Sequence, residues 1–443
     1  MPGRRLTPPR TRCVPLIGMG RRFIRRVVSP VIAGLLIIAT AAACSSHGKL
    51  ISADDTKTAT KESAAKLTVT PKADAGDVPV SAELAAEVDK GELTGISLKD
   101  SNGKTVEGEM RDDESSWVPA EPLEYETSYV VTATAVDDED IEAVHESTFT
   151  TMSSPGNRMS ASLWNSSEIS YGHAMPIMVN FPSEYSVPED MRDEVEKRLF
   201  VEAEPKQPGA WHWFNGHHLE YRPKEFWEPG SQIKVRLGLG GLPLGGDLYG
   251  ATDVTSTVKI ADTVKSVEVD DKTKQLVAYE NGEAVKKMDV SLGKKGHPSY
   301  SGTMIVMEKE KESTFDTTNE PGCNGKEDGK DCYITDVEYA QRLTWSGQYI
   351  HAAPWSVGDQ GERNVSHGCV NISDANAKWI YDFTLLGTPV DVHNTGHELP
   401  YGDGYTAFDL SWEEFLEGSY LPPPGEASDD ESSGEEDTPS EGD

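Results

Sequence analysis

Positive charge is scarce in this chain, and so are cysteine and long apolar runs. The 443 residues include 41 lysines and arginines against 75 aspartates and glutamates, a formal net charge of −34. Eight of the basic residues are arginines within residues 1–43, so the remainder carries 33 basic against 75 acidic residues. Such a surface repels nucleic acids and other polyanions. No basic patch and no phosphate-binding glycine loop occurs, so we expect no nucleic-acid or nucleotide partner.

The one extended apolar run stands near the N-terminus. It extends from Val27 to Ala43, after the eight arginines, and it is too short for a comfortable membrane span. A basic segment, an apolar run and small residues are typical of an export signal, starting at Met1 or at Met19. Small residues followed by Cys44 resemble the lipobox of bacterial lipoproteins, although Ala41 stands where leucine is usual. We favour a lipidated Cys44, with an ordinary secretory signal as the alternative.

Cysteine occurs at only five positions. Cys13 lies in the leader, and Cys44 is the lipidation candidate. Cys323 and Cys332 lie close together in a hydrophilic loop, where an exported protein is expected to form a disulfide. The alternative is a metal-binding pair, but no second pair completes such a site. Cys369 is then the one unpaired cysteine of the folded part, as a nucleophile should be.

Short alternating apolar runs separated by turn residues predict a mainly β protein with two immunoglobulin-like β-sandwiches. The sequence Trp117-Val118-Pro119 recurs as Tyr221-Arg222-Pro223 at an offset of 104 residues, about the size of one such domain. We divide the chain into a lipoprotein-type signal peptide (1–43), a tether (44–65), two sandwiches (66–153 and 154–262), a β-rich domain with a few helices (263–395), a C-terminal subdomain (396–421) and a disordered acidic tail (422–443).

The second sandwich is rich in aromatic residues and histidines. Its aromatic residues are assigned to core and interdomain packing, with a sugar-binding face as the alternative: Trp211, Trp213, Phe214, Phe226 and Trp227. Three histidines have no carboxylates nearby in a metal-binding spacing: His212, His217 and His218. We therefore predict no metal ion and no cofactor.

The third domain shows strand and helix patterns. Asn281-Gly282 between alternating runs predicts a β-hairpin. Helices are predicted over Val337–Leu343 and Ser373–Leu386, the second with Ser373 as its N-cap and Gly387 at its end. Four residues of the second helix should face the core: Ala377, Ile380, Tyr381 and Thr384.

The hexapeptide from Ser366 to Asn371, Ser-His-Gly-Cys-Val-Asn, carries the candidate chemistry. An imidazole partner lowers the pKa of a thiol, so His351 and His367 are expected to hold Cys369 as a thiolate nucleophile. His351 ends a predicted strand and would act as base and then as acid. The backbone amides of Gly368 and Cys369 are predicted to form an oxyanion hole. A buried structural thiol and a core histidine would explain either residue alone, but the combined motif favours acyl transfer through a thioester.

The sequence contains His351, then fourteen residues, then this hexapeptide. This pattern resembles the signature of the L,D-transpeptidase family, which has a YkuD-type catalytic domain. The segments 281–302, 346–347 and 351–358 are similar to mycobacterial and corynebacterial members. Those members are exported and carry two immunoglobulin-like domains before the catalytic domain. The resemblance covers about residues 66–420, and it implies that the β-rich third domain is catalytic.

The resemblance implies peptidoglycan stem peptides as the substrate. Cys369 would attack the carbonyl of the third stem residue, a diaminopimelate, and release D-alanine; an amine of a second stem would then form a 3→3 cross-link. Such an enzyme would act in cell-wall biogenesis and help to determine cell shape. It would be anchored to the membrane by a lipid and face the cell wall, and carbapenems would acylate its cysteine. Substrate-contacting positions carried over from the family are the lid tyrosine Tyr333, Ser346, Gly347, the pocket-wall residue Trp355, and Asn371.

Two features depart from the family pattern. The lid contains an acidic, glycine-rich insertion between Cys323 and Cys332, and residues 243–247 lack the ligands of a calcium site described for some members. Two other functions remain open. If water instead of an amine attacked the thioester, the protein would be an L,D-carboxypeptidase. A protein without catalytic activity would be a wall-anchored binding protein, but the intact pair of His351 and Cys369 argues against this alternative.

Overall fold

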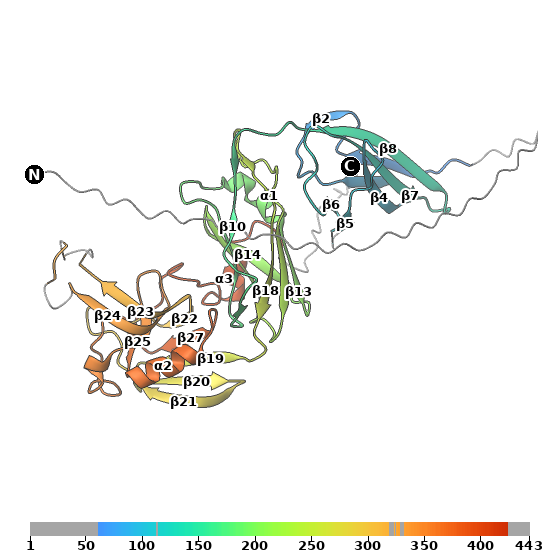
Figure 1. The fold of residues 1–443 in the computed structure, drawn as a ribbon. Coiled ribbons are helices and arrows are strands. Elements are labelled where there is room, and N and C mark those ends of the chain that lie inside the picture. Colours follow the sequence, from blue (N-terminus) through green and yellow to red (C-terminus); the bar gives the residue numbers. More distant parts are fainter. Residues whose placement is uncertain (1–60, 112–113, 319–322, 324, 328–331, 424–443) are drawn as a thin grey trace, which may run out of the picture. The chain divides into compact units, whose positions relative to one another are not determined.

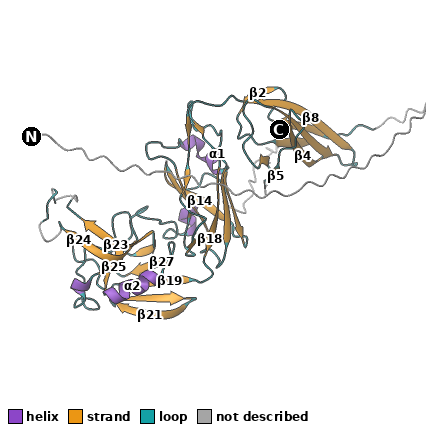
Figure 2. Ribbon diagram, in the orientation of Figure 1, coloured by secondary structure: helices purple, strands orange, loops and turns teal. Residues whose placement is uncertain are grey.

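The computed structural model describes residues 61–111, 114–318, 323, 325–327 and 332–423. Its architecture is mainly β, with few and short helices (Figures 1 and 2). The predicted signal peptide, Cys44, residues 44–60 of the tether and residues 424–443 of the acidic tail lie outside these residues. In the part of the chain that is described, no helix is long and apolar enough to cross a membrane.

The first sandwich is built around a four-stranded sheet of order β2-β8-β7-β4, with two-stranded pairs β1-β3 and β5-β6. Alternation in β7 explains its position, because Val131, Ala133 and Ala135 are fully buried while the residues between them are not. The strands are β1 (Lys66–Thr70), β2 (Ala75–Val78), β3 (Ala85–Asp89), β4 (Glu92–Asp100), β5 (Gly108–Met110), β6 (Trp117–Pro119), β7 (Ser128–Val136) and β8 (Glu142–Thr151).

The second sandwich pairs a β10-β12-β15-β14 sheet with a β11-β18-β16-β13 sheet, and a small β17-β9 pair lies beside them. Two short helices, η1 (Glu189–Met191) and α1 (Arg192–Glu196), precede β13. The strands are β9 (Arg158–Met159), β10 (Ser162–Leu163), β11 (Ser170–Tyr171), β12 (Ile177–Asn180), β13 (Leu199–Glu204), β14 (Gly209–Asn215), β15 (His218–Pro223), β16 (Gln232–Leu237), β17 (Tyr249–Gly250) and β18 (Val254–Ile260).

The two sandwiches share a sheet topology that supports the internal repeat. Strand β7 lies between β4 and β8, both antiparallel, and β2 joins the sheet parallel to β8. Strand β16 likewise lies between β13 and β18, and β11 joins parallel to β18. The repeated motifs at Trp117 and Tyr221 fall on β6 and β15, and both side chains are buried. The aromatic side chains Trp211, Trp213 and Trp227 are buried in the second core, as predicted, while Phe214 and Phe226 are half-buried.

The third domain contains two sheets, a five-stranded β21-β20-β19-β27-β22 and a four-stranded β23-β24-β25-β26 (Figure 1). Asn281 and Gly282 both adopt positive φ, of 51° and 82°, in the predicted hairpin between β20 and β21. The strands are β19 (Lys265–Asp270), β20 (Gln275–Glu280), β21 (Glu283–Asp289), β22 (Gly302–Ile305), β23 (Glu308–Asp316), β24 (Ile334–Arg342), β25 (Tyr349–Ala352), β26 (Val370–Ile372) and β27 (Pro389–His393).

The helix predicted over Val337–Leu343 is wrong, because residues 337–342 belong to strand β24 and Leu343 directly follows it. The strand pairs with β23 along most of its length and with β25 at its end. Tyr339 adopts a φ of +56° in mid-strand, which interrupts the alternation. Val337, Ala340 and Gln341 are therefore buried at a spacing that mimics one face of a helix.

The second predicted helix is present as α2 (Asp374–Phe383), and the Ser373 hydroxyl accepts a hydrogen bond from the Asn376 amide as its N-cap. Its predicted end at Leu386 is wrong, because Thr384 is already extended, with φ −76° and ψ 158°. Ala377, Ile380 and Thr384 are buried as expected, but Tyr381 is half-buried. The C-terminal subdomain contains α3 (Trp412–Leu416), which begins with a capping box and buries Phe415 against the histidine of β14.

Candidate active site

Two parallel strands bring the candidate catalytic residues together. His351 on β25 is paired in register with Asn371 on β26, and Ile350 with Val370. Cys369 immediately precedes β26, so it lies at the end of the strand beside the one that carries His351. The loop between the two strands includes the short helix η2 (Pro354–Ser356). Strand pairing, rather than sequence proximity, sets the geometry of the pair.

The Cys369 thiol is buried, with the residue 9% exposed. Its Sγ donates to the carbonyl oxygen of Gly347 at 3.7 Å. Burial raises the pKa of Cys369 to about 12, while the backbone amide of Tyr349, which hydrogen-bonds to the sulfur, acts in the opposite direction. This position therefore favours the neutral thiol over the thiolate.

The His351 ring is also buried, with the residue 4% exposed. Its Nδ1 lies 2.8 Å from the carbonyl oxygen of Ala352, and because a carbonyl only accepts, Nδ1 carries the proton. Nε2 is then unprotonated, and no described residue hydrogen-bonds to it. Burial lowers the pKa of His351 to about 4, although the bond to Ala352 opposes this. The backbone carbonyl of Ala352 is therefore the group that orients the ring.

These two pKa shifts correct one expectation. The sequence predicted a thiolate held by histidine, but burial favours the uncharged form of both groups. Neutral forms at two paired strands do not prevent reaction, because an unprotonated imidazole nitrogen can take the thiol proton as the sulfur attacks. The site is thus arranged for proton transfer during the reaction and not for a standing ion pair.

Serine hydroxyls hold the catalytic loop. Gly368 adopts a φ of 120°, and its amide donates to Ser366 Oγ at 3.1 Å. Ser366 Oγ in turn donates to the carbonyl oxygen of Cys369 at 2.6 Å, and Ser299 Oγ donates to that of Gly368 at 2.7 Å. The Gly368 amide is therefore engaged, and of the two predicted oxyanion donors only the Cys369 amide has no partner among the described residues.

His367 lies in a polar and aromatic cluster at the site. Lys294 Nζ is 2.8 Å from His367 Nε2. The rings of His297 and Tyr333 lie 4.8 and 5.2 Å from that of His367. Sequence reasoning assigned no role to Lys294, His297 or Ser299, because only the fold brings their segment against the hexapeptide.

The predicted substrate contacts divide into two groups. Asn371 is buried, its Nδ2 donates to Ser356 Oγ at 3.3 Å, and its Oδ1 has no partner among the described residues. Trp355 is 59% exposed, with its ring 6.1 Å from that of His351. Gly347 offers the carbonyl that accepts the Cys369 thiol. Trp355 and Asn371 thus lie beside His351, Gly347 lies at Cys369, and the Tyr333 ring lies beside that of His367.

Ser346 differs from the other predicted contacts. Its backbone amide and its hydroxyl donate to the two carboxylate oxygens of Asp403, at 2.7 and 2.5 Å. The side chain is therefore engaged by the C-terminal subdomain in this structure. The loop that precedes β25 is thereby fixed beside Gly347, which has a φ of 95°.

The expected disulfide joins Cys323 and Cys332 in the segment between β23 and β24. Cys332 directly precedes Tyr333, whose backbone amide donates to Thr317 Oγ1 at 2.9 Å. The Thr317 amide donates back to the Tyr333 carbonyl at 3.0 Å. These contacts anchor the tyrosine at the end of the loop that joins β23 and β24, where its ring lies beside that of His367.

The histidines of the second sandwich have structural partners. His212 Nδ1 lies 2.6 Å from the carbonyl oxygen of Phe415, and its Nε2 lies 2.7 Å from the hydroxyl of Tyr401. His218 lies within hydrogen-bonding distance of Asn180 and Glu220. Across the residues that the structure describes, no cluster of three or more histidine, cysteine or acidic side chains could hold a metal ion.

Comparison with known proteins identifies the family. The model of the L,D-transpeptidase catalytic domain matches residues 265–392, and that of a bacterial Ig domain matches residues 75–243. L,D-transpeptidase 2 of Mycobacterium tuberculosis is 33% identical over 355 residues, which cover 80% of this chain and 85% of that protein. This chain belongs to the L,D-transpeptidase family.

L,D-transpeptidase 5 of Mycobacterium tuberculosis is 30% identical over 370 residues, or 82% of this chain and 78% of that protein. A solved structure of an LD transpeptidase in complex with imipenem aligns with 53% of this chain and 99% of its own, at 27% identity and a TM-score of 0.44. L,D-transpeptidases are acyltransferases with a catalytic cysteine that act on peptidoglycan stem peptides. The chain is thus an enzyme of this class.

Proposed function

We propose that this L,D-transpeptidase forms 3→3 cross-links between stem peptides through a thioester on Cys369. The observation that carries the proposal is the placement of the buried His351 on β25 and of the buried Cys369 directly before its partner strand β26, with His351 Nδ1 fixed by the Ala352 carbonyl and Nε2 without a described partner. A base oriented by a second group beside a nucleophile is the arrangement that nucleophilic catalysis needs.

In the first half-reaction, the Cys369 sulfur attacks the carbonyl carbon of the third stem residue. The thiol proton passes to His351 Nε2, and the Cys369 amide stabilises the oxyanion. Collapse of the tetrahedral intermediate breaks the bond to D-alanine, whose leaving amine takes the proton from His351. The products are a thioester and free D-alanine.

In the second half-reaction, the side-chain amine of an acceptor stem attacks the thioester. His351 Nε2 takes a proton from the amine and returns it to the Cys369 sulfur as the carbon–sulfur bond breaks. The resulting amide is the cross-link. Tyr333, Trp355 and the unpaired Oδ1 of Asn371 are available to orient the peptide chains.

We also propose that the protein is exported and anchored outside the cytoplasmic membrane through a lipid on Cys44. The arginine-rich leader and the apolar run that ends in small residues support this placement. Labelling with a radioactive fatty acid in a bacterial host tests it, because Cys44→Ala should abolish the label while leaving the protein synthesised.

Mass spectrometry of the soluble domains with a disaccharide-tetrapeptide tests the reaction. A cross-linked dimer with release of D-alanine supports transpeptidation, tripeptide without dimer would show an L,D-carboxypeptidase, and neither product would indicate a binding protein. Dimer that persists in Cys369→Ala would contradict the mechanism. Acylation by a carbapenem, seen as a mass increase that Cys369→Ala abolishes, is an independent check of thiol reactivity.

A further inference from the structure

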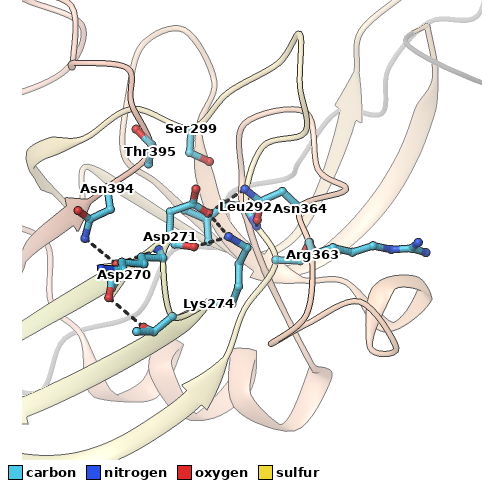
Figure 3. A network of polar contacts seen from close by, with 12 residues as sticks. Asp270, Asp271, Lys274, Leu292, Ser299, Arg363, Asn364, Asn394 and Thr395 are labelled. Carbon is cyan, nitrogen blue, oxygen red and sulfur yellow. Dashed lines mark hydrogen bonds and ion pairs between the residues drawn. The ribbon is translucent and has the colours of Figure 1, made fainter.

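A cavity of about 570 Å³ lies in the catalytic domain beside the segment 292–299. Three other loops complete its walls. Asp271 comes from the turn after β19, Asn364 from the loop before the catalytic hexapeptide, and Thr395 and His397 from the loop after β27. Figure 3 shows one residue from each of the four segments, Asp271, Ser299, Asn364 and Thr395, close to one another. None of the predicted substrate contacts lines this cavity.

The polar groups in its walls are held by one another. Asn364 Nδ2 donates to Asp271 Oδ1 at 2.7 Å, and Lys274 Nζ lies 3.0 Å from the same oxygen. The Leu292 amide donates to Asn364 Oδ1 at 3.2 Å (Figure 3). The carboxylate is therefore neutralised by a lysine, and the walls are ordered without a ligand.

One segment separates the cavity from the catalytic loop. Ser299, which lines the cavity, donates through Oγ to the carbonyl oxygen of Gly368 at 2.7 Å and accepts from the Gly293 amide at 3.0 Å. The Lys294 amide donates to the carbonyl oxygen of Ser366 at 2.9 Å. Lys294 also reaches His367 with its side chain. A group bound in the cavity would thus contact the segment 292–299, which holds the loop that carries Cys369.

The charge of the cavity is opposite to that of the chain. Lys294 and Lys295 line it, and its one carboxylate, Asp271, already has Lys274 as a partner. In a chain with a formal net charge of −34, two lysines beside the catalytic loop favour a small anion over a cation.

We propose that this cavity binds a carboxylate of the acceptor stem peptide. The inference rests on the proposed transpeptidation, which requires two peptides at once. Tyr333 lies beside His367, while Trp355 and Asn371 lie beside His351, and none of the three lines the cavity. An acceptor carboxylate held between 292–299 and 395–397 therefore leaves these positions to the donor peptide. Lys295 supplies a positive charge at the exposed rim of the cavity. It lies in the same segment as Lys294 and Ser299, which hydrogen-bond to the catalytic loop.

Acceptor competition tests this proposal in the full soluble protein. Two acceptor peptides are compared, one with a free terminal carboxylate and one with a carboxamide, at fixed donor. We expect the carboxylate acceptor to half-saturate the wild type at about fivefold lower concentration, as a partly exposed charge pair provides. Lys295→Glu should abolish or reverse this preference. Lys287→Glu, an equal charge change at an exposed position of β21, should preserve it.

A binding measurement separates failure of the cavity from failure of the proposed reaction. Cys369→Ala is titrated calorimetrically with the same two peptides, with and without Lys295→Glu. Tighter binding of the carboxylate peptide, lost in the double variant, supports the site even if the wild type forms no dimer. Equal affinity for both peptides, or an equal effect of Lys287→Glu, would overturn it.

Discussion

Two buried histidines, one in the catalytic domain and one in the second sandwich, have the same solvent exposure but differ in whether a ring nitrogen is left to accept a proton. His351 and His212 are each 4% exposed, and burial lowers the pKa of both. His212 has partners on both ring nitrogens, Phe415 and Tyr401, whereas His351 has a described partner only on Nδ1. A buried imidazole becomes a base when one nitrogen is fixed and the other is left available.

The largest expected effect comes from removing the available nitrogen. His351→Gln should slow acylation by a carbapenem about 10²–10⁴-fold, because the general base is lost. Its free energy of unfolding should change little, since the ring gives up a single hydrogen bond. Rates are measured by mass spectrometry over time and stability by urea denaturation.

His212→Gln is the matched variant on the other side of the comparison. Removing a ring with two buried partners should lower the free energy of unfolding by about 2 kcal/mol. Acylation per folded molecule should stay within about twofold of the wild type. If His212→Gln slowed acylation as much as His351→Gln, burial alone would suffice to explain both effects and the comparison would fail.

The pH dependence of acylation sharpens the same distinction. Because the pKa of His351 is lowered to about 4, Nε2 stays unprotonated down to low pH. The acylation rate should therefore lack a decline centred on 6.5, the ordinary value for histidine, and should fall only as the pH approaches 4. A rate that halves near pH 6.5 in the folded protein would contradict the lowered pKa.

Stability should follow pH in the same window. A histidine whose pKa is lower in the folded state than in the unfolded state binds its proton on unfolding, so stability falls as pH drops below 6.5. For His351, the shift to about 4 corresponds to a loss on the order of 3 kcal/mol between pH 6.5 and 4. The wild type should lose more stability than His351→Gln over this range, as chemical denaturation at several pH values would show.

The smallest effect is expected at the disulfide. Replacing Cys323 and Cys332 by serine should change turnover on a stem peptide a few-fold, because Tyr333 follows Cys332 and lies beside His367. The domain should stay folded, as circular dichroism would show, because the bridge closes a single loop between β23 and β24. Unchanged turnover after reduction, with loss of the disulfide verified by mass, would remove any role of the bridge in the site.

Local patterns predicted much of this molecule. Alternating runs predicted the strands, Asn281-Gly282 predicted a hairpin, and Ser373 predicted the start of a helix, because each depends on contacts close in sequence. The same logic failed at residues 337–343. There a positive φ at Tyr339 breaks the alternation, and pairing with β23 and β25 outweighs the helical spacing.

The sequence by itself determined which residues can do the chemistry: one unpaired cysteine in a glycine-containing hexapeptide, with a histidine upstream. The tertiary structure decided the protonation state of that pair, because burial depends on every neighbour and favours the neutral forms of both Cys369 and His351. It also decided which amide is left for the oxyanion and brought Lys294 and Ser299 against the catalytic loop. Those contacts join segments about 70 residues apart, and only the pairing of distant strands creates them.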